Sequence, residues 1–170
     1  MSDDTQVTDN DQATENAKVG YQVAIELWTY EGELVWSKFN AMLVANSIVL
    51  ALIGFTLNSN QLPQVLAVGM PVAGLLLCLA WFLLTKRGFD NYVYWILSAR
   101  ELEERHLAPI VRTVSRGAYL ADGGKVEIAV GGKSRKYQMG WFSRLLRAEW
   151  SAYLVIIVFA VMYVLLWIYK

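Results

Sequence analysis

The spacing of apolar positions along the chain predicts three helices that cross a membrane. The ranges 39–57, 65–84 and 151–169 are 19 or 20 residues long and contain no Asp, Glu, Lys or Arg. About 20 apolar residues in a helix are enough to cross the hydrocarbon core of a bilayer. The composition agrees, because 56% of the residues are hydrophobic and only 18% are charged. We therefore expect an all-α membrane protein with three transmembrane helices.

Helical periodicity extends beyond the first two spans. Residues 18–38 carry apolar side chains near one face, which predicts an amphipathic helix leading into the first span. Residues 89–107 show the same spacing after the second span, and Pro109 ends it. The connector at 58–64 is short, so the first two spans are expected to form an antiparallel hairpin.

The first 17 residues have a different character. Residues 1–17 contain five acids, no base and no aromatic side chain. A segment of this composition buries too little apolar surface to offset the conformational entropy lost on folding. We expect it to be a disordered acidic tail.

The segment between the second and third spans is expected to contain a small β-ribbon. Within 116–137, glycine pairs separate short β-prone runs. Asp-Gly between such runs is a strong hairpin signal. It predicts that residues 118–121 pair with residues 126–130.

An interfacial helix is expected just before the third span. Residues 141–150 begin and end with Trp, and Arg144 and Arg147 would lie on the polar side of a helix there. Aromatic and basic side chains are typical of helices at a membrane surface.

The distribution of charge predicts the orientation in the membrane. The formal net charge is zero, but residues 86–150 hold twelve Lys and Arg against seven Asp and Glu, whereas the connector at 58–64 has no charged residue. Cytoplasmic loops are enriched in Lys and Arg. We expect the basic segment 85–150 and the N-terminus to be cytoplasmic, with the C-terminus outside a bacterial inner membrane.

Small and polar side chains in the first two spans are candidates for helix–helix contact, because they permit close approach and hydrogen bonding in lipid. The candidates are Asn40, Ala45, Asn46, Ser47, Gly69 and Ala73. They predict either packing of the hairpin within one chain or a face for self-association, including the lining of a pore. Residues 154–168 of the third span are bulky apart from Ala160, which favours lipid contact.

Basic residues in the cytoplasmic segment are candidates for binding an anionic ligand. They are Arg112, Arg116, Lys133, Arg135 and Lys136. One interpretation is a site for the phosphates of a nucleotide or nucleic acid. The other is contact with anionic lipid headgroups beside the membrane.

One pair of residues raises the question of catalysis. Five residues separate Arg100 from His106, a spacing that resembles HEPN ribonucleases and would imply a membrane-tethered ribonuclease. The same run also fits an ordinary helix in which Glu101 and Arg105 form an i,i+4 ion pair. We favour the second interpretation and predict no enzymatic activity. Because the sequence has one His and one Cys, we also predict no metal site and no cofactor.

Three groups of residues together resemble the RipA-type family of small octameric bacterial membrane proteins. The groups are Tyr21, Ala24, Glu26, Leu27, Glu31, Trp36 and Asn46, then Arg87, Gly88 and Trp95, and lastly the run 99–103. A pore-forming accessory protein of type VI CRISPR systems is similar. The resemblance covers roughly residues 20–105 and implies homo-oligomers, a helical membrane hairpin with a cytoplasmic extension, and no enzymatic turnover. The third span and the β-ribbon depart from that pattern.

These observations lead to one main hypothesis. We expect a homo-oligomeric inner-membrane effector that forms a pore or channel in antiphage defence, with the lipid bilayer and further copies of itself as partners. The basic segment would receive an anionic nucleotide or oligonucleotide signal, or a partner protein of a defence system. The alternative is a non-conducting membrane scaffold or regulatory subunit.

Overall fold

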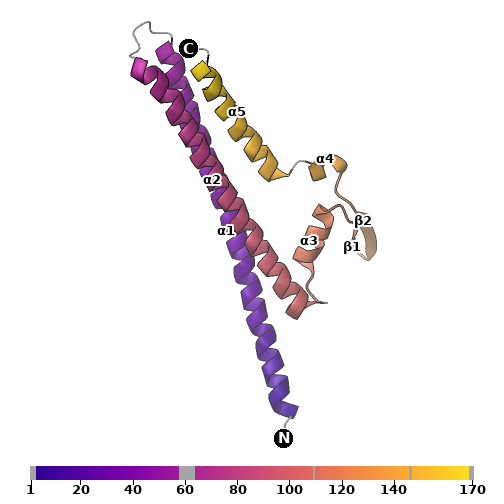
Figure 1. The fold of residues 1–170 in the computed structure, drawn as a ribbon. Helices are drawn as coiled ribbons and strands as arrows, with labels where there is room; N and C mark the ends of the chain where they lie inside the picture. Colours follow the sequence, from indigo (N-terminus) through magenta and orange to yellow (C-terminus); the bar gives the residue numbers. More distant parts are fainter. Residues whose placement is uncertain (1–2, 58–63, 109, 146, 169–170) are drawn as a thin grey trace. The chain divides into compact units, whose positions relative to one another are not determined.

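The computed structural model describes residues 3–57, 64–108, 110–145 and 147–168 (Figure 1). Its helices are α1 (Asp3–Leu57), α2 (Gln64–Leu102), α3 (Thr113–Ala121), α4 (Trp141–Leu145) and α5 (Ala148–Ile168). A π-helical turn, Glu103–Leu107, follows α2, and the strands β1 (Val126–Val130) and β2 (Lys133–Tyr137) lie between α3 and α4 in the chain.

The predicted fold class is confirmed. Three helices, α1, α2 and α5, are long and apolar enough to cross a membrane. The two strands form a small antiparallel sheet. The apolar spans and the β-ribbon are therefore both present.

The chain divides into two compact units. Residues 32–90 and 148–170 form one unit, called the membrane unit because it holds the three uncharged spans. Residues 1–31 and 91–147 form the other, called the extramembrane unit. The helices α1 and α2 contribute to both.

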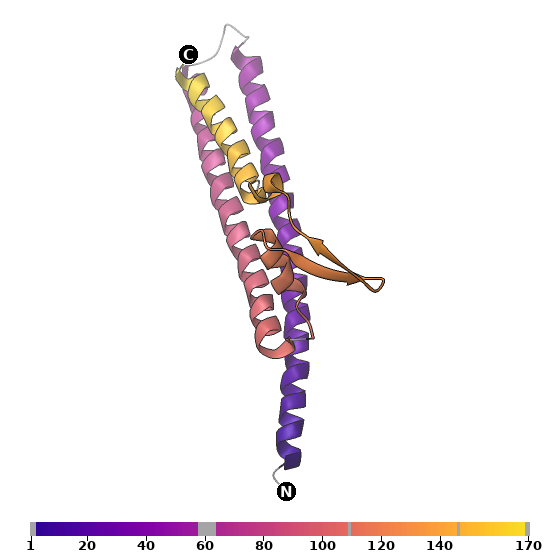
Figure 2. The same cartoon turned by 90° about the vertical axis from the view of Figure 1, so that its right-hand side faces the viewer.

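The helices α1, α2 and α5 lie side by side in the membrane unit (Figure 2), and aromatic side chains pack between them. Phe39 of α1 packs on Trp81 of α2 with ring centroids 4.9 Å apart, and Trp81 packs on Phe159 of α5 at 5.7 Å. Trp81 is fully buried between them. Burial of such a large aromatic surface contributes strongly to packing, so the three helices share one core.

The helix α5 has two different sides. Ala152, Ile156 and Tyr163 are buried in the core of the membrane unit. The residues on the other side are exposed and bulky: Leu154, Ile157, Val158, Val161, Leu165 and Ile168. The expectation of lipid contact for the third span therefore applies to this second side.

The second span and the helix expected after it form one continuous helix. The sequence predicts separate helices at 65–84 and 89–107, but α2 runs from Gln64 to Leu102 and includes Gly88. A Cβ atom at Gly88 would lie 2.5 Å from Cγ2 of Val35 in α1. The glycine therefore permits close approach of the two helices and does not end α2.

In the extramembrane unit, α1 and α2 are again antiparallel neighbours. The rings of Trp28 and Tyr92 are 5.4 Å apart. Ala24 of α1, Ala99 of α2 and Val114 of α3 form a small buried cluster. This cluster fastens α3 to the two long helices.

The prediction of a disordered tail at 1–17 is wrong for the residues of this segment that the structure describes. The helix α1 already begins at Asp3. The sequence has no Gly or Pro before Gly20, so nothing interrupts the helix. Local side-chain pairs add to it, with Gln12 Nε2 donating to Asn16 at 3.2 Å and Lys18 Nζ lying 2.5 Å from Glu15.

The predicted pairing of the β-ribbon is also wrong. Residues 118–121 belong to α3, and β1 pairs instead with β2, from Val126 opposite Tyr137 to Val130 opposite Lys133. The glycines explain this choice. Gly131 and Gly132 have φ values of 58° and 73°, as a two-residue type I′ hairpin turn requires.

The Asp-Gly-Gly sequence ends α3. Gly123 has a φ of 94°, its N–H donates to the Leu120 carbonyl at 3.0 Å, and the Gly124 N–H donates to the Tyr119 carbonyl at 2.8 Å. These two bonds form a Schellman motif, which satisfies carbonyl groups at the end of a helix. The signal that predicted a hairpin turn is thus a helix C-cap.

The interfacial helix is shorter than expected. It covers Trp141–Leu145, and the third long helix begins at Ala148, before the predicted start at 151. Glu149 and Trp150 therefore belong to α5, where Glu149 stands in the first turn. An acid there interacts favourably with the positive end of the helix dipole.

Candidate functional site

A buried polar cluster lies in the core of the membrane unit. Asn46 of α1 is fully buried, and its Nδ2 donates to the Met42 carbonyl at 2.9 Å. Its Oδ1 accepts from the Tyr163 hydroxyl of α5 at 3.3 Å and from the Cys78 thiol of α2 at 3.5 Å. One amide therefore links all three spans, and both its nitrogen and its oxygen have a hydrogen-bond partner, as burial in hydrocarbon favours.

Gly74 makes room for this cluster. A Cβ atom at Gly74 would overlap the ring of Tyr163, which is fully buried. The absence of a side chain on α2 therefore lets the phenol reach Asn46. This close approach favours the first of the two alternatives for Asn46, packing within one chain.

The other candidates in the spans differ in how exposed their side chains are. Asn40, Ser47, Gly69 and Ala73 are exposed on the membrane unit, and Ala45 is half-buried. The exposed members remain available for contact with another molecule.

Asn40 and Ser47 belong to a longer exposed row on α1. The row follows a 4-3-4-3 spacing, which places its members on one helix face. Its members, called the α1 stripe, are Asn40, Val44, Ser47, Ala51 and Gly54. Four of the five are small or polar, and among the described residues nothing beyond its own helix lies within 4 Å of a Cβ atom built at Gly54.

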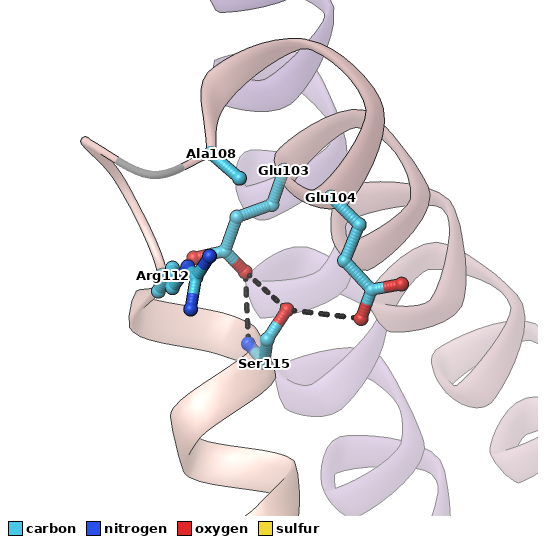
Figure 3. A pocket seen from close by; sticks show the side chains of 5 residues that line it. All are labelled: Glu103, Glu104, Ala108, Arg112 and Ser115. Atoms are coloured by element: carbon cyan, nitrogen blue, oxygen red, sulfur yellow. Dashed lines mark hydrogen bonds between the residues drawn. The ribbon is translucent and has the colours of Figure 1, made fainter.

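A second site surrounds a buried carboxylate in the extramembrane unit (Figure 3). Glu103 lies in the π-helical turn and is fully buried. It accepts hydrogen bonds from the Val114 N–H at 3.2 Å, the Ser115 N–H at 2.8 Å and the Ser115 hydroxyl at 3.0 Å. The carboxylate thus caps the first turn of α3, where N–H groups lack helical partners.

A small open pocket adjoins this cap. It has a volume of about 210 Å³ and is lined by Glu103, Glu104, Ala108, Arg112 and Ser115. Figure 3 shows both carboxylates extending toward Ser115, whose hydroxyl also lies 3.3 Å from Glu104 Oε1. The two carboxylates already accept hydrogen bonds from α3. The arrangement therefore explains how α3 is held in place better than it explains the binding of a ligand.

The negative charge of Glu103 also influences α1. Burial, and to a smaller extent the charge of Glu103, raises the pKa of the Tyr21 phenol above its ordinary value of 10.0. Glu103 thus caps α3 by hydrogen bonds and acts on Tyr21 of α1 through its charge.

The sequence carries a signal for Glu103 that pattern analysis missed. Ile96, Ala99 and Leu107 lie at helical spacing around it, so an acid occupies an apolar face. A buried acid requires hydrogen-bond donors. Those donors come from Val114 and Ser115, which no local pattern predicts.

The residues of the ribonuclease-like pair lie in different helical segments. Arg100 stands in the last turn of α2, and the exposed His106 lies in the π-helical turn. In the described part of the chain, no side-chain hydrogen bond or ion pair joins them. The predicted pair between Glu101 and Arg105 is present, with an N–O distance of 2.9 Å.

The five predicted anion-binding residues occupy two elements. Arg112 precedes α3 and Arg116 lies within it, whereas Lys133, Arg135 and Lys136 are on β2; all five are exposed. Lys136 lies opposite Glu127, with their charged atoms 3.5 Å apart. Lys133 and Arg135 alternate with Lys136 and therefore point to the other face of the ribbon.

Together, the apolar spans, the buried polar cluster and the capped helix define a three-span helical membrane protein. Residues 19–170 match the model of the octameric membrane protein family (8xMP), and the chain belongs to that family. No curated protein and no solved structure matches the chain. The family description agrees with the membrane and self-association predictions.

Proposed function

We propose that the protein is the subunit of a non-enzymatic, homo-oligomeric membrane effector that forms a pore. The observation that carries this is the α1 stripe, an exposed face with small and polar side chains inside an uncharged span. Between helices in lipid, association depends on close packing and hydrogen bonds, for which small residues and Ser or Asn are suited. The described family of octameric membrane proteins supports self-association.

The contrast between the spans supports this choice of face. On α2, Gly69, Ala73 and Ala80 are exposed small residues. The exposed side of α5 instead carries branched and bulky side chains, which suit lipid. We therefore place α1 and α2 at the contacts between copies and the exposed side of α5 toward the bilayer.

A pore needs polar groups along its lumen. Asn40 and Ser47 are exposed in the first span, and Ser47 donates to the Leu43 carbonyl of its own helix at 2.8 Å. A ring with α1 at its centre would bring several copies of these two side chains around one axis. Ala51 and Gly54 of the stripe would provide the close contact between copies, and Asn40 and Ser47 would contact water and ions.

We further propose that the pore acts in antiphage defence in a bacterial inner membrane. The support is the resemblance of roughly residues 20–105 to RipA-type proteins and to the similar type VI CRISPR accessory protein. The excess of Lys and Arg in residues 86–150 supports a cytoplasmic position for the extramembrane unit.

The experiment combines an assembly assay with an ion-flux assay. Ala51→Leu with Gly54→Leu fills the α1 stripe, and Val158→Leu on the exposed side of α5 is the control. The stripe variant should shift from oligomer to smaller species in mild detergent and lose dye or ion flux from liposomes, while the control should retain both. Flux that persists in a monomeric variant would contradict the proposal. Intact oligomers of the unmodified protein without any flux would favour the scaffold alternative.

A further inference from the structure

One face of the β-ribbon is both apolar and basic. Cross-strand partners in an antiparallel pair point to the same face, and faces alternate along each strand. Two cross-strand pairs of one face are Ile128 with Arg135 and Val130 with Lys133. Tyr137 extends the same face, and Ile128, Val130 and Tyr137 are 45%, 64% and 54% exposed. This set is called the ribbon face.

The opposite face of the ribbon is electrically balanced. It carries Glu127 opposite Lys136, which form an ion pair, and Ala129 opposite Ser134. Neither Lys133 nor Arg135 forms an ion pair within the described part of the chain. Free positive charge and exposed aliphatic surface therefore coincide on the ribbon face.

The helix α4 carries a similar combination. Trp141 and Phe142 are 66% and 69% exposed, with ring centroids 4.7 Å apart. Arg144 is held in place, because its Nε donates to the Met139 carbonyl at 3.0 Å and its guanidinium lies beside Gly123. Gln138, directly after β2, donates to the Gly123 carbonyl at 2.9 Å. These bonds tie α4 and the ribbon to the C-terminal end of α3.

Only a short connection separates α4 from the third span along the chain. The apolar helix α5 starts at Ala148, three positions after α4 ends at Leu145. Three residues span at most about 11 Å. An exposed Trp next to a membrane span is typical of the bilayer interface, and the adjacent Phe142 adds apolar surface, so the aromatic pair has a natural partner in lipid.

We propose that the ribbon face docks on the anionic headgroups of the bilayer in which the protein is embedded. The charge is complementary, because residues 122–147 contain six Lys and Arg and two Asp and Glu. Ile128 and Val130 would reach the glycerol level while Lys133 and Arg135 bind phosphates, as basic side chains do when they extend from apolar surface. A nucleic-acid site would use the two bases but would gain little from the aliphatic side chains.

The test measures which face of the ribbon contacts lipid. In the full-length Cys78→Ala protein, an environment-sensitive fluorophore is attached at Val130→Cys or at Ala129→Cys, the matched position on the opposite face. Each protein is placed in phosphatidylcholine nanodiscs with or without about one-third phosphatidylglycerol, a mixture that supplies the negative surface charge. Quenching is recorded with a headgroup-level nitroxide lipid and with aqueous iodide.

We expect lipid quenching of the Val130 probe in the anionic discs, with protection from iodide, and iodide quenching of the Ala129 probe. Replacing Lys133 and Arg135 by Gln should lower the ratio of docked to undocked ribbon by about fivefold for each base. The control pair, Lys125→Gln with Lys136→Gln, removes the same charge and should lower the ratio of docked to undocked ribbon clearly less.

Three outcomes would overturn the proposal. The first is equal quenching of the two probes in both kinds of disc. The second is an equal loss of docking in the two charge-matched pairs of substitutions, which would indicate that the ribbon is attracted to anionic lipid without a defined face. The third is a Val130 probe that stays in water in anionic discs and becomes protected by a short single-stranded RNA, which would assign the face to nucleic acid.

Discussion

The phenolic oxygen of Tyr163 lies 3.2 Å from the backbone oxygen of Asn46, although 117 residues separate the two in the chain. The same hydroxyl is 3.3 Å from Asn46 Oδ1. A single O–H donates to either acceptor, and in both cases it connects α5 to α1. The third span is thus held to the helical hairpin by a polar contact as well as by apolar packing.

The first prediction concerns this hydroxyl. Tyr163→Phe should lower the free energy of unfolding in detergent by about 1 kcal/mol, since it removes a hydrogen bond between helices in an apolar core. Tyr153→Phe is the matched control, because its hydroxyl bonds to Glu149 of the same helix. Titration with a denaturing detergent, followed by circular dichroism, measures both. Equal losses for the two variants would argue against the link between α1 and α5.

The second prediction concerns Gly74. Gly74→Ala places a methyl group against the Tyr163 ring and should destabilise the membrane unit by about 1–3 kcal/mol, as overpacking of a core does. Gly69→Ala should not lower the stability of the single chain, because among the described residues nothing beyond its own helix lies within 4 Å of the added Cβ. Thermal unfolding in detergent distinguishes the two. An unchanged unfolding stability in Gly74→Ala would show that α2 and α5 can move apart without a loss of stability.

The third prediction concerns the cap of α3. Glu103→Gln keeps the shape of the side chain but leaves one oxygen to serve two N–H groups and turns an NH₂ group toward donors. We expect a loss of about 1–3 kcal/mol in local stability, the usual range for an unsatisfied buried group. Amide hydrogen exchange of Val114 and Ser115 reports it, with the exposed Glu104→Gln as the control. Unchanged exchange in Glu103→Gln would exclude the capping role.

The fourth prediction concerns orientation. In the Cys78→Ala protein, a membrane-impermeant thiol reagent added from the periplasmic side should label Asn60→Cys and should not label Ser134→Cys on the exposed ribbon. The reason is the concentration of Lys and Arg in residues 86–150. Periplasmic labelling at 134 would reverse the orientation.

The fold followed from the sequence wherever one physical property dominates. A run of about 20 uncharged apolar residues has few alternatives to a transmembrane helix, and each of the three predicted runs falls in a helix that is long and apolar enough to cross a membrane. The choice between two glycine turns was harder, because Asp122-Gly123-Gly124 and Gly131-Gly132 carry similar local signals. Whether α3 is helical decides between them, and that depends on the distant cap supplied by Glu103.

The candidate sites were predictable only in part for the same reason. The polar character of Asn46 in an apolar span was evident, but its partner Tyr163 lies on another helix and could not be inferred from spacing. The basic residues of β2 were identified as a group, whereas their division between two faces depends on the pairing register. Contacts between distant segments, such as Glu103 with Ser115, are set by tertiary packing and leave no local pattern.

The most direct test of the central claim is the native mass of the unmodified protein extracted in mild detergent. The chain has a mass of 19.2 kDa and belongs to the octameric membrane protein family. We predict a single dominant species with eight times the mass of one chain, which separates into smaller species when the α1 stripe is filled by Ala51→Leu and Gly54→Leu. A monodisperse monomer of the unmodified protein, folded and with α5 in place, would contradict the account.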